Sequence, residues 1–202
     1  MRWEQGVALL DRHLSRAEAA AAALDFEFDK TAIHEAFQQH EASLDKNVAY
    51  RLRLTINRGG GIQITSSPID PEVSAFRRVV LSPQPLTSQR PLAAYKTTDR
   101  AEYENAYEAV VSKGFDEAIL LNERDEVVEG SRTNVWIRRA GRWLTPVLES
   151  GCLPGVFRAH LLDTLERAAE ATLTVDDLVG ADQVAVSNAV HGFSNVEFML
   201  NC

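Results

Sequence analysis

Four short segments of the sequence carry residue types that could do chemistry together. Lys96 stands in the segment Tyr-Lys-Thr-Thr-Asp-Arg, and Glu129 opens the segment Glu-Gly-Ser-Arg-Thr-Asn. Two turn-forming segments follow, Leu-Pro-Gly-Val-Phe-Arg at 153–158 and Val-Ser-Asn-Ala at 186–189. A lysine can form a Schiff base, a carboxylate can hold a ring nitrogen, and tight turns can hold a phosphate. These are the parts that a pyridoxal phosphate enzyme requires.

Each of these residues also has a plain structural explanation. A lone lysine is usually a solvated surface charge. A carboxylate such as Glu129 is common at the end of a hairpin, and Leu153 and Val156 could simply pack in the core. The chemical interpretation therefore depends on finding all four segments, in this order, in one chain.

The composition is that of an ordinary globular protein, and 202 residues are enough for one or two domains with a real core. A net charge of -8 argues against nucleic acid or an anionic membrane as the main partner. No apolar run approaches the ~20 residues of a membrane span, and the first residues lack a signal-peptide profile. Cys152 and Cys202 are too few and too far apart for a disulfide framework or a metal site. We therefore expect a cytoplasmic protein with no metal, membrane or nucleic-acid partner.

The hydrophobic periodicity predicts a mixed set of helices and strands. The predicted helices cover 11–24, a stretch from Asp29, 101–113 and 155–170; the predicted strands cover 48–56, 62–65, 78–81, 115–121, 127–129, 134–137, 143–145, 183–187 and 196–200. Asp11, Asp29 and Asp99 are the expected N-caps. The glycine triplet 59–61 predicts a hairpin turn, and it lacks the Lys-Ser/Thr that a phosphate loop would need.

Pro83 and Pro85 predict a linker between two lobes, a smaller N-terminal α+β lobe at 1–85 and a larger lobe at 86–202. In the first predicted helix, Arg12 and Arg16 share one face and could gather an anion, or could form a solvated basic edge. The histidines show no shared metal-ligand spacing and are expected at the surface or at caps: His13, His34 and His40.

In their order, these motifs resemble the class IV aminotransferase family, the fold-type IV pyridoxal phosphate enzymes, over nearly the entire chain. The segment that contains Lys96, together with 114–117, 121–123 and 143–146, is most similar to the 4-amino-4-deoxychorismate lyases of that family. The resemblance implies a two-lobed α+β fold, like that of D-amino acid aminotransferase, with shortened N-terminal strands. It also implies that 86–202 is the cofactor-binding lobe.

The resemblance assigns residues to a pyridoxal 5'-phosphate site. That site would consist of Arg16, Lys96, Glu129, Leu153, Gly155, Val156, Phe157, Asn188 and Ala189. Lys96 would be the Schiff-base lysine and the catalytic base, with a pKa lowered by a buried, cation-rich pocket. Glu129 would pair with the ring nitrogen, and Arg16 would hold the phosphate. Candidates for binding the substrate carboxylates are Arg51, Arg53, Arg132 and His191.

The implied activity is that of a lyase that releases pyruvate and 4-aminobenzoate from a small-molecule substrate in folate biosynthesis, with the chain acting as a homodimer. Family members begin with a strand of which Met1-Arg2 resembles only the tail, and this departure predicts altered or lost activity unless translation starts upstream. Two alternatives stay open. One is a transaminase of the same family, acting on a D-amino or branched-chain amino acid, and the other is a cofactor-binding module without activity.

Overall fold

The computed structural model describes residues 1–70, 76–87 and 92–201. The chain divides into two compact units, Met1–Ser74 and Ala75–Cys202. The boundary lies before strand β4 (Arg78–Leu81), whereas the sequence suggested a boundary after Pro85. The reason is that β4 pairs in parallel with two strands of the second unit, β5 (Glu117–Leu121) and β11 (Gly192–Met199).

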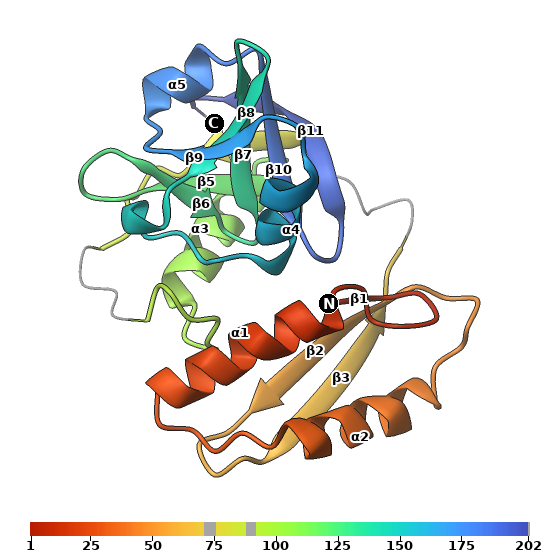
Figure 1. Cartoon of the computed structure of the whole chain (residues 1–202). Helices are drawn as coiled ribbons and strands as arrows, with labels where there is room; N and C mark the ends of the chain where they lie inside the picture. Colours follow the sequence, from red (N-terminus) through yellow and green to blue (C-terminus); the bar gives the residue numbers. More distant parts are fainter. Residues whose placement is uncertain (71–75, 88–91, 202) are drawn as a thin grey trace. The chain divides into compact units, whose positions relative to one another are not determined.

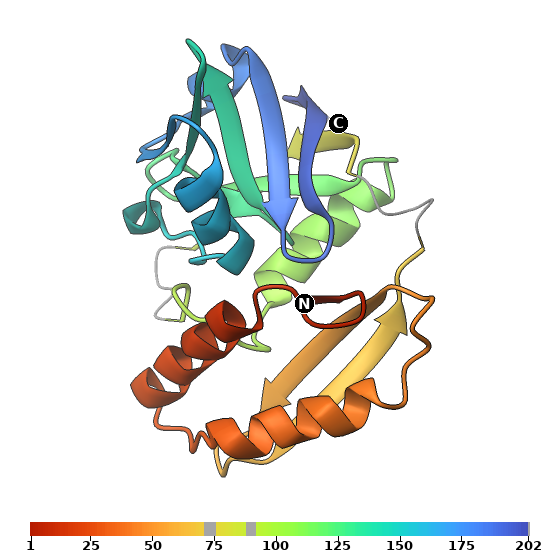
Figure 2. The ribbon, with the colours of Figure 1, turned by 45° about the vertical axis from the view of Figure 1, so that its right-hand side comes forward.

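The first unit is a small sheet covered by two helices (Figures 1 and 2). Its described elements are β1 (Arg2–Trp3), α1 (Leu10–Ala23), α2 (Lys30–Glu41), β2 (Tyr50–Ile56) and β3 (Ile62–Pro68), with the strands in the order β1-β2-β3. Leu14 of α1, Phe37 of α2 and Leu52 of β2 pack in one buried cluster. Both helices therefore bury their apolar faces against the same strands, as the helical and alternating periods predicted.

The two helices of this unit begin differently. The Asp29 side chain accepts a hydrogen bond from the Ala32 amide at 3.0 Å, which confirms the predicted cap of α2. Helix α1 instead begins after Leu9, which has a left-handed backbone with φ 57° and makes no side-chain cap. The predicted cap, Asp11, lies in the first turn, where its charge still suits the helix dipole. His13 is buried next to Leu14, so its predicted surface position is wrong.

The second unit is built on a curled sheet with helices beside it (Figure 1). Its described elements are β4 (Arg78–Leu81), α3 (Ala101–Val111), β5 (Glu117–Leu121), β6 (Val127–Gly130), β7 (Asn134–Arg139), β8 (Arg142–Pro146), the 3-10 turn η1 (Leu148–Ser150), α4 (Val156–Thr164), β9 (Ala168–Ala171), α5 (Val175–Val179), β10 (Gln183–Asn188) and β11 (Gly192–Met199). Among the described residues, eight strands pair in the order β6-β5-β4-β11-β10-β7-β8-β9.

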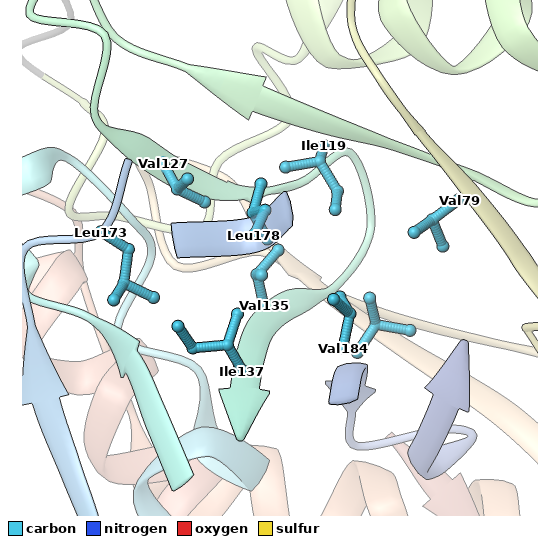
Figure 3. Packing of buried hydrophobic residues seen from close by; sticks show 9 residues of the cluster. Val79, Ile119, Val127, Val135, Ile137, Leu173, Leu178 and Val184 are labelled. Atoms are coloured by element: carbon cyan, nitrogen blue, oxygen red, sulfur yellow. The ribbon is translucent and has the colours of Figure 1, made fainter. Parts of the chain in front are cut away.

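The sheet curls until its two edges approach each other. At one edge the Val127 amide of β6 donates to the Leu173 carbonyl at 2.7 Å, and Glu126 pairs with Thr174 just beyond β9. The enclosed space is filled by branched aliphatic side chains from both edges and from the middle of the sheet (Figure 3). This core fixes where the ends of β5, β6 and β10 lie, and those ends carry the candidate site.

Two predicted helix features of this unit are wrong. Helix α4 ends at Thr164 and does not continue to Glu170, because Ala168–Ala171 pairs in parallel with β8 as strand β9. Alanine favours a helix locally, and here the sheet pairing outweighs that preference. Asp99 does not cap α3, whose N-cap position is Arg100 without a side-chain cap.

Cys152 is a free, buried cysteine, and burial raises the pKa of its thiol to about 12, so it is not a reactive thiol; Cys202 lies outside the described residues. Within the described ranges, none of the helices has the length and hydrophobicity needed to cross a membrane. The same ranges contain no cluster of three side chains able to hold a metal ion.

Candidate active site

A cavity of about 240 Å³ opens in the second unit beside the start of α3. The segment before α3 contributes Tyr95 and Thr97 to its lining, and the first turn of α3 contributes Tyr103. Glu129 lines it from the end of β6, and Leu153 lines it from the loop before α4. Three of the four segments singled out in the sequence therefore meet at one cavity.

Lys96 lies between two residues that line this cavity, Tyr95 and Thr97. The Thr97 amide donates to the Tyr95 carbonyl at 3.1 Å, which closes a tight turn around the lysine. The Lys96 side chain is exposed. The prediction that this lysine is buried is therefore wrong.

Glu129 is a buried carboxylate whose two oxygens are both held by donors. It is 5% exposed, and its Oε1 accepts a hydrogen bond of 2.5 Å from the Tyr103 hydroxyl. Its Oε2 accepts from the Leu153 amide at 3.1 Å, with the Asn134 amide nitrogen at 3.5 Å. Hydrogen bonds to a charged acceptor are among the stronger ones in proteins. The carboxylate is therefore fixed at the cavity wall, and the hairpin-end surface position is excluded.

Asn134, at the start of β7, joins two of the predicted site segments, its own segment from Glu129 and the segment 153–158. Its side chain donates to the Leu153 carbonyl at 3.1 Å as well as reaching Glu129. Its Oδ1 also lies against Gly155, the N-cap of α4. The amides of Val156 and Phe157 follow in the first turn of α4, where backbone N–H groups have no acceptor within the helix. Asn134 therefore links the Glu129 carboxylate to the N-terminus of α4.

This close approach predicts that position 155 tolerates no side chain. A Cβ on Gly155 would overlap Asn134 Oδ1, so we expect Gly155→Ala to lower the free energy of unfolding by about 1–3 kcal/mol through overpacking. Gly59→Ala is the control, because its Cβ would lie 3.8 Å from Asn57 Oδ1, an ordinary contact. Urea denaturation of both variants checks this, and equal midpoints would contradict it.

The second turn segment is organised by Asn188, at the end of β10. Its Oδ1 accepts from the Val190 and His191 amides at 2.9 and 2.8 Å, which closes the turn that contains Ala189. Its amide nitrogen donates to the Arg132 carbonyl at 3.3 Å. The structure thus brings together the Asn188 turn and the turn between β6 and β7, with Arg132 and His191 on the two sides of the contact.

A fully buried carboxylate, Glu117, holds the turn between β6 and β7, and the sequence interpretation gave it no role. It accepts hydrogen bonds from the Ser131 hydroxyl, from the Arg132 amide at 3.0 Å and from the Thr133 hydroxyl at 2.9 Å. A Cβ on Gly130 would overlap the Thr133 hydroxyl. In the sequence, the signal that could have indicated a buried acceptor was the presence of two hydroxyl residues and a glycine in one turn.

The buried position of Glu117 predicts a pH dependence of stability. Burial raises the pKa of Glu117 above its usual value of 4.5. The folded chain then keeps the proton at pH values where the unfolded chain has lost it, so this contribution to stability is complete below 4.5 and declines as the pH rises toward the raised folded pKa. Glu117→Gln stays neutral, so its Tm relative to the wild type should increase from pH 4.5 upward. Thermal melts across this range would contradict the account if the difference stayed constant.

The remaining predicted site residues belong to the first unit. Arg16 is half-buried on α1, while Arg51 and Arg53 are exposed on β2, on the side opposite Leu52. Their assignment to the phosphate and to substrate carboxylates stays a prediction.

Comparisons with known proteins agree with this picture. A family model for class IV amino-transferases matches residues 1–197. A candidate aminodeoxychorismate lyase of Schizosaccharomyces pombe (strain 972 / ATCC 24843) is 30% identical over 187 residues, which cover 90% of this chain and 80% of the relative.

Solved structures show the same architecture. A candidate amino-acid aminotransferase from Mesorhizobium loti superposes with a TM-score of 0.89 at 35% identity, covering 98% of this chain and 97% of the other. The 4-amino-4-deoxychorismate lyase from Pseudomonas aeruginosa superposes with a TM-score of 0.79 at 25% identity, covering 94% of this chain and 77% of the other. The family and the mixed α+β fold predicted from the sequence are confirmed. The protein belongs to the class IV aminotransferase family, whose members are lyases and aminotransferases that depend on pyridoxal phosphate.

Proposed function

We propose that the protein is a 4-amino-4-deoxychorismate lyase that forms 4-aminobenzoate and pyruvate for folate synthesis. The observation that carries the proposal is the Glu129 carboxylate, fixed at the wall of a cavity whose lining flanks Lys96. The likeness to the Schizosaccharomyces pombe relative, over 90% of this chain, supports the choice of the lyase reaction.

The residues at the cavity fit pyridoxal phosphate by their chemistry. A buried carboxylate with both oxygens already held in place suits a protonated ring nitrogen, because an opposite charge favours the charged form of that nitrogen. Leu153 offers an apolar surface beside it. The α4 N-terminus, with Gly155, Val156 and Phe157, suits an anion such as a phosphate.

When bound, pyridoxal phosphate supplies a ring that accepts electrons from the carbon next to the substrate amine. The other steps are carried out by residues of the protein. Lys96 would hold the cofactor through its Nζ, and the same amine, once released, would serve as a base. It then takes the proton from the amine-bearing ring carbon. The electron pair of that C–H bond forms the new ring double bond that makes the product aromatic, the C–O bond to the enolpyruvyl group breaks, and the released enolpyruvate takes up a proton to become pyruvate.

The remaining assignments concern the phosphate and the substrate carboxylates. We assign the phosphate to Arg16 and to the turn at Asn188 and Ala189. Arg132 and His191 are our candidates for binding the substrate carboxylates. They are supported by the hydrogen bond between the two turns that carry them. Arg51 and Arg53 are further candidates, because they are exposed cations on neighbouring positions of one strand face.

A transaminase is the second candidate function. It is favoured by the 35% identity to the candidate amino-acid aminotransferase from Mesorhizobium loti, a match that covers 98% of this chain. The Glu129-to-Asn134 segment and the Lys96 site would serve either reaction, because both need proton removal beside an amine.

A product assay separates the two candidates. With pyridoxal phosphate and 4-amino-4-deoxychorismate, the purified protein should release 4-aminobenzoate and pyruvate in equal amounts. With D-alanine or leucine alone, it should form little 2-keto acid. Keto acid formation with no 4-aminobenzoate would replace the lyase by a transaminase. Cofactor binding without either product would leave a binding module without activity.

We also propose that the chain works as a homodimer, as the family resemblance implies. Light scattering on the eluting protein tests this, and the expected mass is twice the 22.4 kDa of one chain. A mass of one chain at concentrations used for the activity assay would contradict it.

A further inference from the structure

Helix α3 carries two tyrosines one turn apart, and each contacts a different charged residue of the segment from β6 to β7. Tyr103 donates its hydroxyl proton to Glu129 Oε1 at 2.5 Å. Four residues on, the Tyr107 ring lies under the Arg132 guanidinium, whose Cζ is 3.4 Å from the ring centroid. Residues four apart lie on the same face of a helix. One face of α3 therefore reaches both the proposed cofactor partner and a proposed substrate-binding residue.

We infer that Tyr103 and Tyr107 are positioning residues, one for the Glu129 carboxylate and the other for the Arg132 guanidinium. The inference rests on the proposed function, because it takes Glu129 as the partner of the ring nitrogen and Arg132 as a ligand of a substrate carboxylate. It adds that one helix, α3, affects two affinities separately: the affinity for the cofactor through Tyr103 and the affinity for the substrate carboxylate through Tyr107.

Tyr103 is suited to hold Glu129 because it is itself buried and packed. Its side chain is 9% exposed and packs with Leu120, Val128 and Cys152. The phenol holds Oε1 while the Leu153 amide holds Oε2, so the carboxylate cannot rotate without losing a hydrogen bond. A short hydrogen bond to a charged acceptor is strong. Tyr103 thus keeps the carboxylate at the cavity wall, ready to oppose a positive ring nitrogen.

Tyr107 has a different role, which is to restrict the motion of Arg132, an exposed side chain. A long exposed arginine samples many rotamers, and immobilising it on binding opposes affinity. Stacking on an aromatic face holds the guanidinium in one orientation and leaves its edge N–H groups available for a carboxylate. The backbone beneath is fixed as well, since the Arg132 amide donates to Glu117.

Arg100 connects the two contacts. Its guanidinium lies over the Tyr103 ring, 4.5 Å from the centroid, and its Nη2 donates to the Ser131 carbonyl at 2.6 Å. The N-terminus of α3 is thereby tied to the turn that follows Glu129. The tyrosines and their partners therefore belong to one connected network.

The test compares two tyrosine variants in binding assays that need no turnover. For Tyr103→Phe we expect the Kd for pyridoxal phosphate to rise about tenfold, with a shift in the pH profile of the bound cofactor's absorbance. For Tyr107→Leu we expect an unchanged Kd for pyridoxal phosphate. The Kd for 4-aminobenzoate, followed by tryptophan fluorescence of the cofactor-loaded protein, should rise about threefold.

Matched controls separate positioning from general damage. Tyr107→Phe keeps the ring and should restore the affinity for 4-aminobenzoate, while Tyr50→Phe in the first unit should leave both affinities unchanged. Wild-type cofactor affinity in Tyr103→Phe would overturn the role of Tyr103. Equal 4-aminobenzoate affinities for Tyr107→Leu and Tyr107→Phe, or no binding of that probe to the wild type, would overturn the role of Tyr107. A protein that shows both affinity changes but no lyase products would refute the proposed function and leave this inference standing.

Discussion

Replacement of Lys96 by alanine should lower kcat for 4-aminobenzoate formation by at least about 10³-fold. The loss is large because one side chain has two tasks, binding the cofactor covalently and moving the proton at the amine-bearing carbon. The position between Tyr95 and Thr97, which line the cavity, supports both tasks. Single-turnover measurement of 4-aminobenzoate release, with saturating cofactor, gives the value directly.

The controls for this variant are a second lysine and an added amine. Lys46→Ala removes an exposed lysine of the first unit and should keep full activity. Methylamine supplied to Lys96→Ala should restore part of the turnover, because a free amine can replace the missing base. Activity of Lys96→Ala within tenfold of the wild type would remove this lysine from the mechanism.

Glu129→Gln should lower kcat by about 10²–10³-fold, the usual effect of losing one preorganised electrostatic contact in an active site. Glutamine keeps the size of the side chain and lacks the charge that would hold a proton on the ring nitrogen. The variant should also change the absorbance spectrum of the bound cofactor. Steady-state kinetics and the visible spectrum of the same sample check both expectations.

Glu149→Gln is the matched control, because Glu149 is an exposed carboxylate of the same unit. It should leave both kcat and spectrum unchanged. A Glu129→Gln protein that is folded, by its thermal melt, and retains both wild-type values would show that Glu129 does not hold the ring nitrogen.

The elements that could be predicted from the sequence are those with strong local signals. The alternation of Leu52 and Leu54 with Arg51 and Arg53 predicted β2, and the buried Leu52 confirms which face is covered. Asp29 predicted the start of α2 because its side chain meets the Ala32 amide within one turn. In both cases the stabilising partner lies within a few residues or on the adjacent strand.

The largest error arose where a distant partner decides the conformation. The alanine-rich end of the predicted 155–170 helix becomes β9, because β8 offers a sheet edge that the local sequence does not reveal. Asp99 and Asp11 look like caps, yet both helices begin at another residue without a side-chain cap. Local preference is weak compared with tertiary pairing.

The candidate site was predicted only in part for the same reason. The motifs located Glu129 and Leu153, which line the cavity. The sequence could not show that Tyr103 donates to Glu129, since 26 residues separate them. Nor could it show that Glu117 is buried, because a glutamate is normally expected at the surface.

The most direct test of the account is to map where the protein binds its cofactor. The purified protein is loaded with pyridoxal phosphate, reduced with borohydride, digested and analysed by mass spectrometry. We predict a single modified peptide, with the label on Lys96. A label on another lysine, or no label after reduction, would contradict the central claim that Lys96 binds the cofactor covalently while Glu129 faces its ring nitrogen.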